Sequence, residues 1–416
     1  MTASGLLRFL LFLGILFLID LYAWKGISTA LPSLPPAARR VIKWVYWTIS
    51  AGMLVAVVYV GANFRTLRNA HDHSTLFTLF GLLVLFLLPK LVLVIFHGVE
   101  DLAQAVRWAW AKATEQGPSS GEGISRMRFL SQIGLAAASV PFFGVLYGIT
   151  RGRGRFHVAE MDITAKGLPK AFDGLRIVQI SDMHLGSFAK HSDIVQHGVD
   201  LINEQRPDLI LFTGDLVNDF ADEAAAWIPT LQSLQARIGK FSILGNHDYS
   251  DYVEWDSAKD KTANLDLLKQ YHADAGFKLL LDEHVRVSDG ADHFALVGVQ
   301  NWGVRFQKYG DLRKALTGTE GSPYRLLMSH DPTHWDAEVR GKGVGLMLSG
   351  HTHGAQFGIN ILGRTYSPAQ WFYKQWAGLY SEGDEHLYVN RGFGFIGFPG
   401  RVGMPPEITV LTLRSA

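Results

Sequence analysis

The sequence predicts an α/β domain built from two packed, mixed β-sheets flanked by helices, preceded by an all-α transmembrane module. Two features of the 416-residue chain predict this division. Apolar residues are concentrated in residues 1–150, whereas short β-rich segments follow one another from residue 156 onward. Between these parts, residues 151–155 form a basic, glycine-containing linker of the kind that separates domains.

The first part contains four apolar segments, each close to the ~20 residues that a helix needs to cross hydrocarbon. They cover roughly residues 6–24, 44–62, 76–96 and 129–149. Trp24, Trp44 and Tyr46 lie at segment ends, where aromatic rings favour the headgroup layer. A cleaved signal peptide is the alternative for the first segment, but three more segments would still follow it. We therefore predict a multi-pass integral membrane protein.

Basic residues in the short loops indicate the orientation of the chain in the membrane. Loops that are rich in Lys and Arg tend to face the cytoplasm, and the majority of the basic residues predicts that the C-terminal domain lies outside the cytoplasm. The opposing basic residues are Arg8, Arg65, Arg68, Arg151, Arg153 and Arg155. The loops carry Lys25, Arg39, Arg40 and Lys43 after the first segment, and Arg107, Lys112, Arg126 and Arg128 after the third. The stretch 125–130, Ser-Arg-Met-Arg-Phe-Leu, resembles a degraded twin-arginine export signal and favours the same side.

Two ionisable residues, Asp20 and Lys90, fall within the apolar segments. An ionisable group in hydrocarbon indicates a paired group or a pathway. Both residues lie toward the later end of segments that run in the same direction, so they could pair at similar depth. The alternative is that each side chain extends to the nearer membrane interface.

Composition excludes several classes of site and partner. The net charge of +1 provides no overall field that would attract nucleic acid, so we expect no specific nucleic-acid partner. The chain has no cysteine, which excludes disulfides, zinc–thiolate sites and cysteine nucleophiles. Any metal must therefore be bound by His, Asp, Glu, Asn or water.

In the second part, five short apolar runs each end in a cluster of polar residues. These runs are residues 175–180, 208–212, 241–244, 324–329 and 344–348. Helical stretches at 192–204 and 222–234 separate the early runs, whereas later β-rich runs near 294–299, 386–390 and 408–413 suggest a second sheet. Because α/β sheets place ligands at the carboxyl ends of their strands, we expect the polar clusters to meet at one rim.

The polar residues at these five ends form a metal-binding set: Asp182, His184, Asp215, Asn246, His247, His330, His351 and His353. Carboxylate, imidazole and amide oxygen suit manganese, iron and zinc. Two such ions ~3.5–4 Å apart can hold the attacking and departing oxygens of an in-line displacement. The set therefore predicts a dinuclear site and hydrolysis at phosphorus.

The ordered blocks Asp182-Met-His184, Gly214-Asp215, Gly245-Asn246-His247-Asp248, His330 and Gly350-His351-Thr-His353 resemble the calcineurin-like metallophosphoesterase superfamily, including its exported and membrane-associated bacterial phosphodiesterases. The resemblance implies that residues 156–416 form a metallophosphoesterase domain of the α/β/β/α type. It also implies two divalent metal ions, with attack on phosphorus by a metal-bound hydroxide.

Specific roles follow from the resemblance. It assigns Asp182, His184 and His353 to one metal and Asn246, His330 and His351 to the other. Asp215 would bridge the two ions, and His247 would protonate the leaving alkoxide. A ligand-free histidine beside two cations can physically act as such a proton donor.

Three further residues have weaker indications. Asp248 either orients His247 or is a solvent-facing carboxylate in a turn. Arg391 follows a strand and is a candidate phosphate clamp. His334, four residues after His330, is the best candidate for a substrate contact among the remaining histidines of the domain.

The substrate class stays open at this point. The aromatic stretch 366–380 is either core packing or a platform that faces lipid or substrate. The leading hypothesis is a membrane-anchored hydrolase of phosphodiesters or phosphomonoesters, with a lipid or another amphiphilic phosphoester as the candidate substrate. The alternatives are a nucleotide or cyclic-nucleotide phosphoesterase, and a non-catalytic membrane receptor or transport component that binds a phosphorylated ligand. The sequence does not indicate an oligomeric state.

Overall fold

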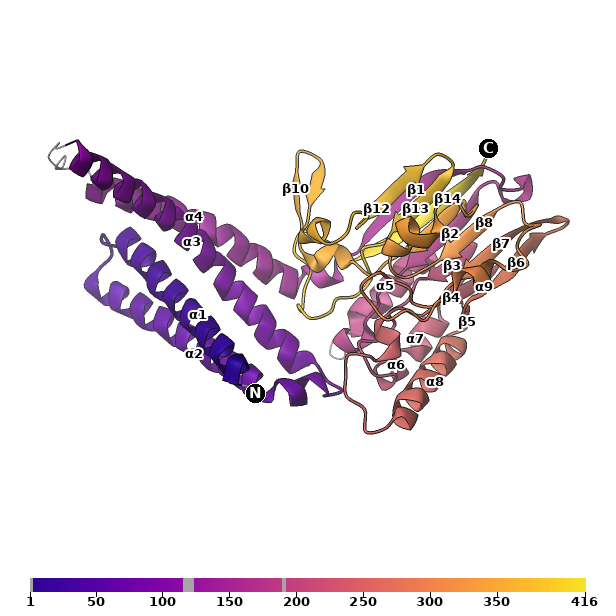
Figure 1. Ribbon diagram of the computed structural model, residues 1–416, viewed down its shortest axis with the longest axis horizontal. Coiled ribbons are helices and arrows are strands. Elements are labelled where there is room, and N and C mark those ends of the chain that lie inside the picture. The colour runs from indigo at the N-terminus through magenta and orange to yellow at the C-terminus, as the bar shows by residue number, and fades with distance from the viewer. Residues whose placement is uncertain (1–2, 115–122, 189–191) are drawn as a thin grey trace. The chain divides into compact units, whose positions relative to one another are not determined.

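The computed structural model of the protein describes residues 3–114, 123–188 and 192–416. The chain divides into two compact units, each of which makes most of its contacts within itself (Figure 1). The first unit is Met1–Leu67 with Thr78–Tyr147, and the second is Arg68–Phe77 with Gly148–Ala416. The segment Arg68–Phe77 thus belongs with the second unit, although the sequence analysis placed all of residues 1–150 in the membrane module. The side chains of Ser125 and Arg126, in the twin-arginine-like stretch, lie outside the described residues.

Long apolar helices build the first unit. Within the described part of the chain they are α1 (Ala3–Ala30), α2 (Pro36–Arg68), α3 (Ser74–Ala113) and α4 (Gly123–Thr150). All four are long and apolar enough to cross a membrane, and at most 22% of each apolar window is buried inside the protein. Apolar side chains therefore point outward, as expected of helices that lipid surrounds. The four predicted segments are confirmed as helices, and each helix extends beyond its predicted ends.

Asp20 and Lys90 pair with each other inside the first unit. Nζ of Lys90 lies 2.5 Å from Oδ1 of Asp20, and both side chains are buried. The hydroxyl of Ser50 donates to the same oxygen at 3.1 Å, and the Lys90 ammonium donates to the Ser50 hydroxyl at 3.0 Å. Of the two alternatives for these residues, the structure shows pairing rather than separate extension to the interface.

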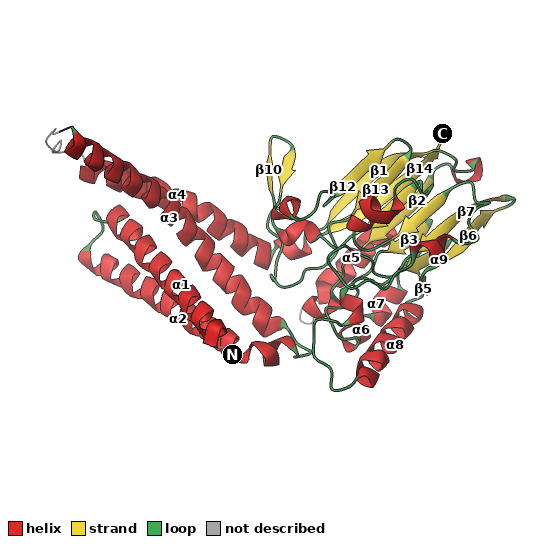
Figure 2. Ribbon diagram, in the orientation of Figure 1, coloured by secondary structure: helices red, strands yellow, loops and turns green. Residues whose placement is uncertain are grey.

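The second unit contains two six-stranded sheets among its described residues (Figure 2). The first sheet has the order β1–β14–β2–β3–β4–β5, and the second has the order β12–β13–β9–β8–β7–β6. Both sheets mix parallel and antiparallel pairs; for example, β2 is parallel to β3 and antiparallel to β14. The first sheet comprises β1 (His157–Ala165), β2 (Leu175–Ile180), β3 (Leu209–Phe212), β4 (Gly239–Ser242), β5 (Lys278–Leu279) and β14 (Glu407–Ser415).

The second sheet comprises β6 (Glu283–Asp289), β7 (Asp292–Gly298), β8 (Arg325–Met328), β9 (Leu346–Ser349), β12 (Gly378–Glu382) and β13 (Glu385–Val389). A separate hairpin joins β10 (Ile359–Ile361) to β11 (Arg364–Tyr366). The central core lies between the two large sheets. Ile177 and Leu211 of the first sheet belong to the same buried cluster as Leu326 and Leu348 of the second. Alternate residues of each strand point into this core, as the two-residue period of a strand requires.

Helices cover the outer faces of the sheets. The outer side chains of β2 and β3 share a buried cluster with α5 (Ser192–Glu204), α7 (Ile228–Gln232) and α8 (Ala258–Asp274). The second sheet shares a cluster with α9 (Leu312–Leu316) and the helical turn Trp335–Val339. These layers confirm the predicted α/β/β/α arrangement.

One predicted helix is interrupted. The expected helix over 222–234 consists of α6 (Asp222–Ala225) and α7. Pro229 lies in the first turn of α7. Its ring would clash with the carbonyl group four residues earlier, at Ala225, in a continuous helix. The first helix therefore ends at that residue.

Candidate metal centre

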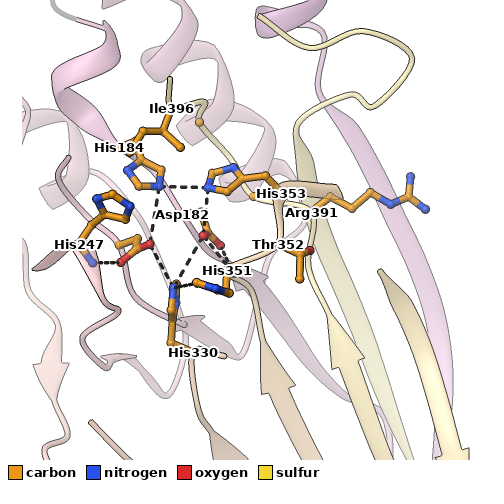
Figure 3. Close-up of polar contacts among 12 residues, drawn as sticks. Asp182, His184, His247, His330, His351, Thr352, His353, Arg391 and Ile396 are labelled. Carbon is orange, nitrogen blue, oxygen red and sulfur yellow. Dashed lines mark hydrogen bonds and ion pairs between the residues drawn. The ribbon is translucent and has the colours of Figure 1, made fainter. Parts of the chain in front are cut away.

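The residues of the site follow the carboxyl ends of five strands (Figure 3). Strands β2, β3 and β4 are parallel neighbours in one sheet, and β8 and β9 are parallel neighbours in the other. This topology brings the five polar clusters to one rim, as the sequence predicted. Each cluster contributes at least one of the predicted site residues.

The backbone is strained at most of these positions. Five of the predicted ligands have φ in the left-handed region, which side chains other than glycine rarely adopt. These are Asp182 (53°), His184 (47°), Asp215 (60°), His351 (71°) and His353 (50°). Such conformations cost energy and cluster where function requires a fixed geometry. Their concentration at one rim marks it as a functional site.

The first ligand group consists of Asp182, His184 and His353. Nε2 of His184 lies 3.1 Å from Nε2 of His353, which in turn lies 3.2 Å from Oδ1 of Asp182. All three residues are buried, and their candidate ligand atoms lie within 4.8 Å of one another. Two imidazole nitrogens and one carboxylate oxygen thus converge on one point.

The second ligand group consists of Asp215, His330 and His351, with Asn246 beside them. Nε2 of His330 lies 3.1 Å from Oδ2 of Asp215 and 3.3 Å from Nδ1 of His351. Oδ1 of Asn246 lies 2.7 Å from that same Nδ1 atom. Asn246 therefore presents its oxygen to the second group.

Asp215 lies between the two groups. Its Oδ2 atom, 3.1 Å from His330, is also 3.7 Å from Nε2 of His184 in the first group. The other oxygen, Oδ1, accepts a hydrogen bond of 2.9 Å from the backbone N–H of His247. A carboxylate in this position can bind two cations at once and reduce their mutual repulsion.

The electrostatics of the cluster fit two divalent cations. Burial lowers the pKa of His184 well below its usual value, so this imidazole is neutral, the form that binds metal. Burial acts in the same direction on His330, but the carboxylates of Asp215 and Asp182 outweigh it and raise the pKa of His330 to about 10. The raised pKa means that the two buried carboxylates attract positive charge at His330. In the absence of metal, a proton on His330 supplies that charge. Nδ1 of His330 donates to the carbonyl of Thr213 at 2.7 Å, which leaves Nε2 free to bind metal.

His247 adjoins the cluster but belongs to neither ligand group. Its ring lies edge-on to the ring of His184, with centroids 5.0 Å apart. Nδ1 of His247 is 2.7 Å from the backbone carbonyl oxygen of Asn218. Burial lowers the pKa of His247 to about 4. Its position beside the ligands agrees with the expectation of a non-ligating histidine.

Neither interpretation of Asp248 holds in the structure. The carboxylate is buried rather than solvent-facing, and it contacts backbone N–H groups rather than the imidazole of His247. It accepts hydrogen bonds from the N–H groups of Asp215 and Leu216 at 2.8 Å and of Gly245 at 2.9 Å. Asp248 therefore ties the loop after β3 to the loop after β4. The Asn218 carbonyl, not Asp248, orients His247.

The two candidate substrate contacts lie apart from the cluster. Arg391 turns away from it and pairs with Glu407 of β14, with Nε 3.3 Å from Oε2 (Figure 3). His334 is buried, stacks on Trp302 at 4.3 Å and lies 2.8 Å from the hydroxyl of Ser329. The structure therefore supports neither a phosphate clamp at Arg391 nor a substrate contact at His334.

Three residues that the sequence analysis did not single out support the site. The Tyr373 hydroxyl lies 2.9 Å from Nε2 of His351, and the Tyr252 hydroxyl accepts a hydrogen bond of 2.8 Å from the Asn246 amide. The buried guanidinium of Arg401 donates to the carbonyl oxygens of His353 and Arg391 at 3.1 and 2.7 Å. Tyr373 lies in the aromatic stretch 366–380, and Arg401 lies between Gly400 and Gly403. Neither residue is part of a sequence motif that would have identified it as a site residue.

A sandwich of two mixed sheets with paired Asp/His ligand groups at its strand ends defines a metallophosphoesterase domain. Residues 175–355 match the family described as "Calcineurin-like phosphoesterase", and residues 7–153 match "Probable Calcineurin-like phosphoesterase, transmembrane domain". The chain belongs to the calcineurin-like phosphoesterase family, as a member with an N-terminal transmembrane module.

Three relatives illustrate the two parts of the chain. "Uncharacterized metallophosphoesterase YkuE" of Bacillus subtilis is 33% identical over 309 residues, which cover 70% of this chain and 98% of the relative. "Phosphodiesterase YaeI" of Escherichia coli is 28% identical over 298 residues, or 70% of this chain and 99% of the relative. "Transmembrane protein with metallophosphoesterase domain" of Danio rerio is 26% identical over 428 residues, which cover 98% of this chain and 90% of the relative. The similarity to the last of these includes the membrane module.

Proposed function

We propose that the chain is a membrane-anchored, metal-dependent phosphohydrolase that cleaves phosphodiesters or phosphomonoesters. The observation that carries this proposal is the position of Asp215 between two ligand groups, with His247 beside them. Asp182, His184 and His353 would hold one divalent ion, and Asn246, His330 and His351 the other; manganese, iron and zinc all suit these ligands. Bound in pairs, such ions activate water and neutralise charge on phosphoryl oxygens.

His247 would act as the general acid. A backbone carbonyl only accepts hydrogen bonds, so the contact with Asn218 places a proton on Nδ1 of His247. Burial keeps the free imidazole neutral near pH 7, so Nε2 would take up a proton when the anionic phosphoester binds beside it and would then give that proton to the leaving oxygen. Donation of this kind lowers the barrier most for alkoxides, which are poor leaving groups.

An exposed apolar surface beside the site supports an amphiphilic substrate. The hairpin β10–β11 projects from the sandwich (Figure 1). The side chain of Leu362, between β10 and β11, is fully exposed. Trp371 and Phe372 follow the hairpin and are 75% and 58% exposed. The next residue, Tyr373, contacts His351. The aromatic stretch 366–380 thus has exposed side chains and one side chain in contact with a candidate ligand.

The root of the hairpin is linked to the end of the last membrane helix. The N–H of Gly358 donates to the carbonyl of Val402 at 2.8 Å, and the N–H of the neighbouring Arg401 donates to the carbonyl of Gly148 at 3.1 Å. Gly148 lies two residues before the end of α4. The exposed apolar side chains of Leu362, Trp371 and Phe372 support an amphiphilic phosphoester as the substrate class that we propose.

A substrate panel on the full-length chain in lipid nanodiscs tests this proposal. We expect turnover that depends on added manganese, iron or zinc and that favours lipid phosphoesters over nucleotides and cyclic nucleotides. Preferential turnover of nucleotides would replace the lipid hypothesis by the nucleotide alternative. Binding of phosphorylated ligands by the metal-loaded chain, without any turnover, would favour the receptor alternative.

We also propose that the four helices all cross the membrane and that the catalytic domain lies outside the cytoplasm. Because the chain has no cysteine, single cysteines can report its topology. Asp384→Cys, in the turn between β12 and β13, should react with a membrane-impermeant maleimide in intact cells. Ser33→Cys, between α1 and α2, should react only after permeabilisation. The reverse pattern would place the domain in the cytoplasm.

A further inference from the structure

We propose that the segment Arg68–Phe77, which connects α2 with α3, is a positioning element of the active site and that Arg68 is its central residue. The proposal rests on the function proposed above, in which His247 acts as the acid. The segment lies far from the metal ligands in sequence but belongs to the same compact unit. Residues of this segment contact the loop 218–222 and the loop 252–254, and both loops border His247.

Arg68 contacts both loops with one side chain. Nε of Arg68 donates a hydrogen bond of 3.1 Å to the backbone carbonyl of Tyr252, and the guanidinium lies 5.7 Å from the centre of the Tyr252 ring. Nη2 of Arg68 lies 3.6 Å from Oδ2 of Asp219. The Arg68 side chain is only 24% exposed, and that of Asp219 is fully buried. The contacts are therefore shielded from solvent, where ion pairs have their largest effect.

Asp219 depends on this partner. Neither of its carboxylate oxygens has a hydrogen bond among the described residues. Burial raises the pKa of Asp219 to about 8 even with Arg68 beside it, because the charge of Arg68 offsets only part of the shift. The other basic group nearby, His73, is 3.9 Å away, but burial lowers its pKa, and its Nε2 contacts the carbonyl of Arg68 at 3.0 Å. Arg68 is thus the cationic group that faces the buried carboxyl and offsets part of the effect of its burial.

Both partners of Arg68 are next to functional side chains. Asp219 directly follows Asn218, whose carbonyl accepts the hydrogen bond from Nδ1 of His247. The ring of Tyr252 lies 4.7 Å from the ring of His247, and its hydroxyl accepts from the Asn246 amide. Loss of Arg68 would therefore release His247 on two sides, at the Asn218 carbonyl and at the Tyr252 ring.

Other residues of the segment hold the same two loops. The His71 ring stacks on Phe220, with centroids 3.9 Å apart, and its Nδ1 lies 2.8 Å from Oδ2 of Asp222. Oδ1 of Asn69 accepts a hydrogen bond of 3.2 Å from the N–H of Glu254. The connection between two membrane helices thus fixes the loop 218–222 and the loop 252–254. Catalytic alignment depends on a part of the chain that a fragment beginning near residue 156 would lack.

A mutant cycle in the full-length chain tests the role of Arg68. The variants are Arg68→Ala, Asp219→Asn, the double variant and Arg68→Lys, assayed with aryl and alkyl phosphoesters of graded leaving-group acidity. Arg68→Ala should lower kcat by ~10- to 10²-fold for poor leaving groups, because a misplaced catalytic group costs this much. KM and metal content should change little. Arg68→Lys keeps the charge and should retain most of the activity.

Asp219→Asn in the Arg68→Ala background should restore most of kcat and of the unfolding midpoint, because the uncompensated carboxyl is gone. Arg237→Ala is the matched control: it removes an arginine that pairs with Asp208 at 2.5 Å and is largely exposed, and it should leave both quantities unchanged. An equal loss for all leaving groups, or no rescue in the double variant, would overturn the proposal. If the wild type turns over no substrate, the proposed function fails, but rescue of the unfolding midpoint still decides whether Arg68 compensates Asp219.

Discussion

Nδ1 of His247 lies 2.7 Å from the backbone carbonyl oxygen of Asn218. This contact fixes the ring and its tautomer, because a carbonyl oxygen accepts a proton donor and cannot donate one. The free Nε2 atom is then available to a departing oxygen, whereas a metal ligand would use its lone pair. His330 makes the same kind of contact with the Thr213 carbonyl but belongs to a ligand group, so His247 differs from a ligand by its place outside both groups, and kinetics can test the distinction.

His247→Ala should reduce turnover by ~10²–10⁴-fold on substrates with poor leaving groups, which is the usual contribution of a general acid. The loss should shrink as the leaving group becomes more acidic, because such a group departs without a proton. Metal content should stay nearly unchanged. His351→Ala is the comparison, since loss of a ligand should lower metal content and harm all substrates alike. A uniform loss with His247→Ala, together with loss of metal, would show that His247 is a ligand.

Asp248→Ala should destabilise the catalytic domain. The carboxylate accepts hydrogen bonds from the backbone N–H groups of Asp215, Leu216 and Gly245, and a buried donor without a partner costs about 1–3 kcal/mol. Thermal unfolding should therefore shift to lower temperature, and metal retention should fall because Asp215 is no longer held. Asp266→Ala on the exposed surface of α8 is the control. An unchanged unfolding midpoint for Asp248→Ala would contradict the role of this residue in joining the two loops.

A fluorophore at the tip of the β10–β11 hairpin should report contact with lipid. The absence of native cysteine allows specific labelling of Leu362→Cys with a polarity-sensitive dye in nanodiscs. Its emission should shift to the blue, and brominated lipids should quench it. The same dye at Asp384→Cys, in the turn between β12 and β13, should show neither effect. Equal quenching of both labels by aqueous iodide, with no effect of brominated lipids, would refute lipid contact by the hairpin.

The buried pair of Asp20 and Lys90 should stabilise the membrane helices. Asp20→Leu alone leaves the Lys90 ammonium buried without its partner, and such losses cost ~3–5 kcal/mol. The full-length chain in detergent should then unfold at clearly lower temperature. Asp20→Leu combined with Lys90→Leu removes both charges and should recover most of the stability. If the single and double variants unfold at the same temperature as the wild type, the pair has no structural role.

The fold could be predicted because its strands carry their own signal. The apolar run 175–180 and the polar residues Asp182 and His184 after it follow from local sequence alone. The same holds for the ligands after β3, β4, β8 and β9, since parallel strands bring their carboxyl ends to one edge. The split of the helix over 222–234 also has a local signal, because Pro229 lies in the first turn of α7.

The remaining features of the site depend on contacts without a local signal. The group that orients His247 is a backbone carbonyl, and such a group could belong to any residue. Arg391 turns away from the metal ligands because Glu407, the first residue of the next strand β14, offers it a carboxylate. Arg68 approaches Asp219 across about 150 positions of sequence, a pairing that only the tertiary structure reveals.

Metal content and turnover, measured on the same purified full-length protein with and without Asp215→Asn, test the dinuclear site. We expect two divalent ions per wild-type chain, because Asp215 lies between two ligand groups. Asp215→Asn removes the anionic oxygen that both ions would share, so metal content and turnover should fall together. If the Asp215→Asn protein kept both ions and a near-normal rate, the dinuclear assignment would be wrong.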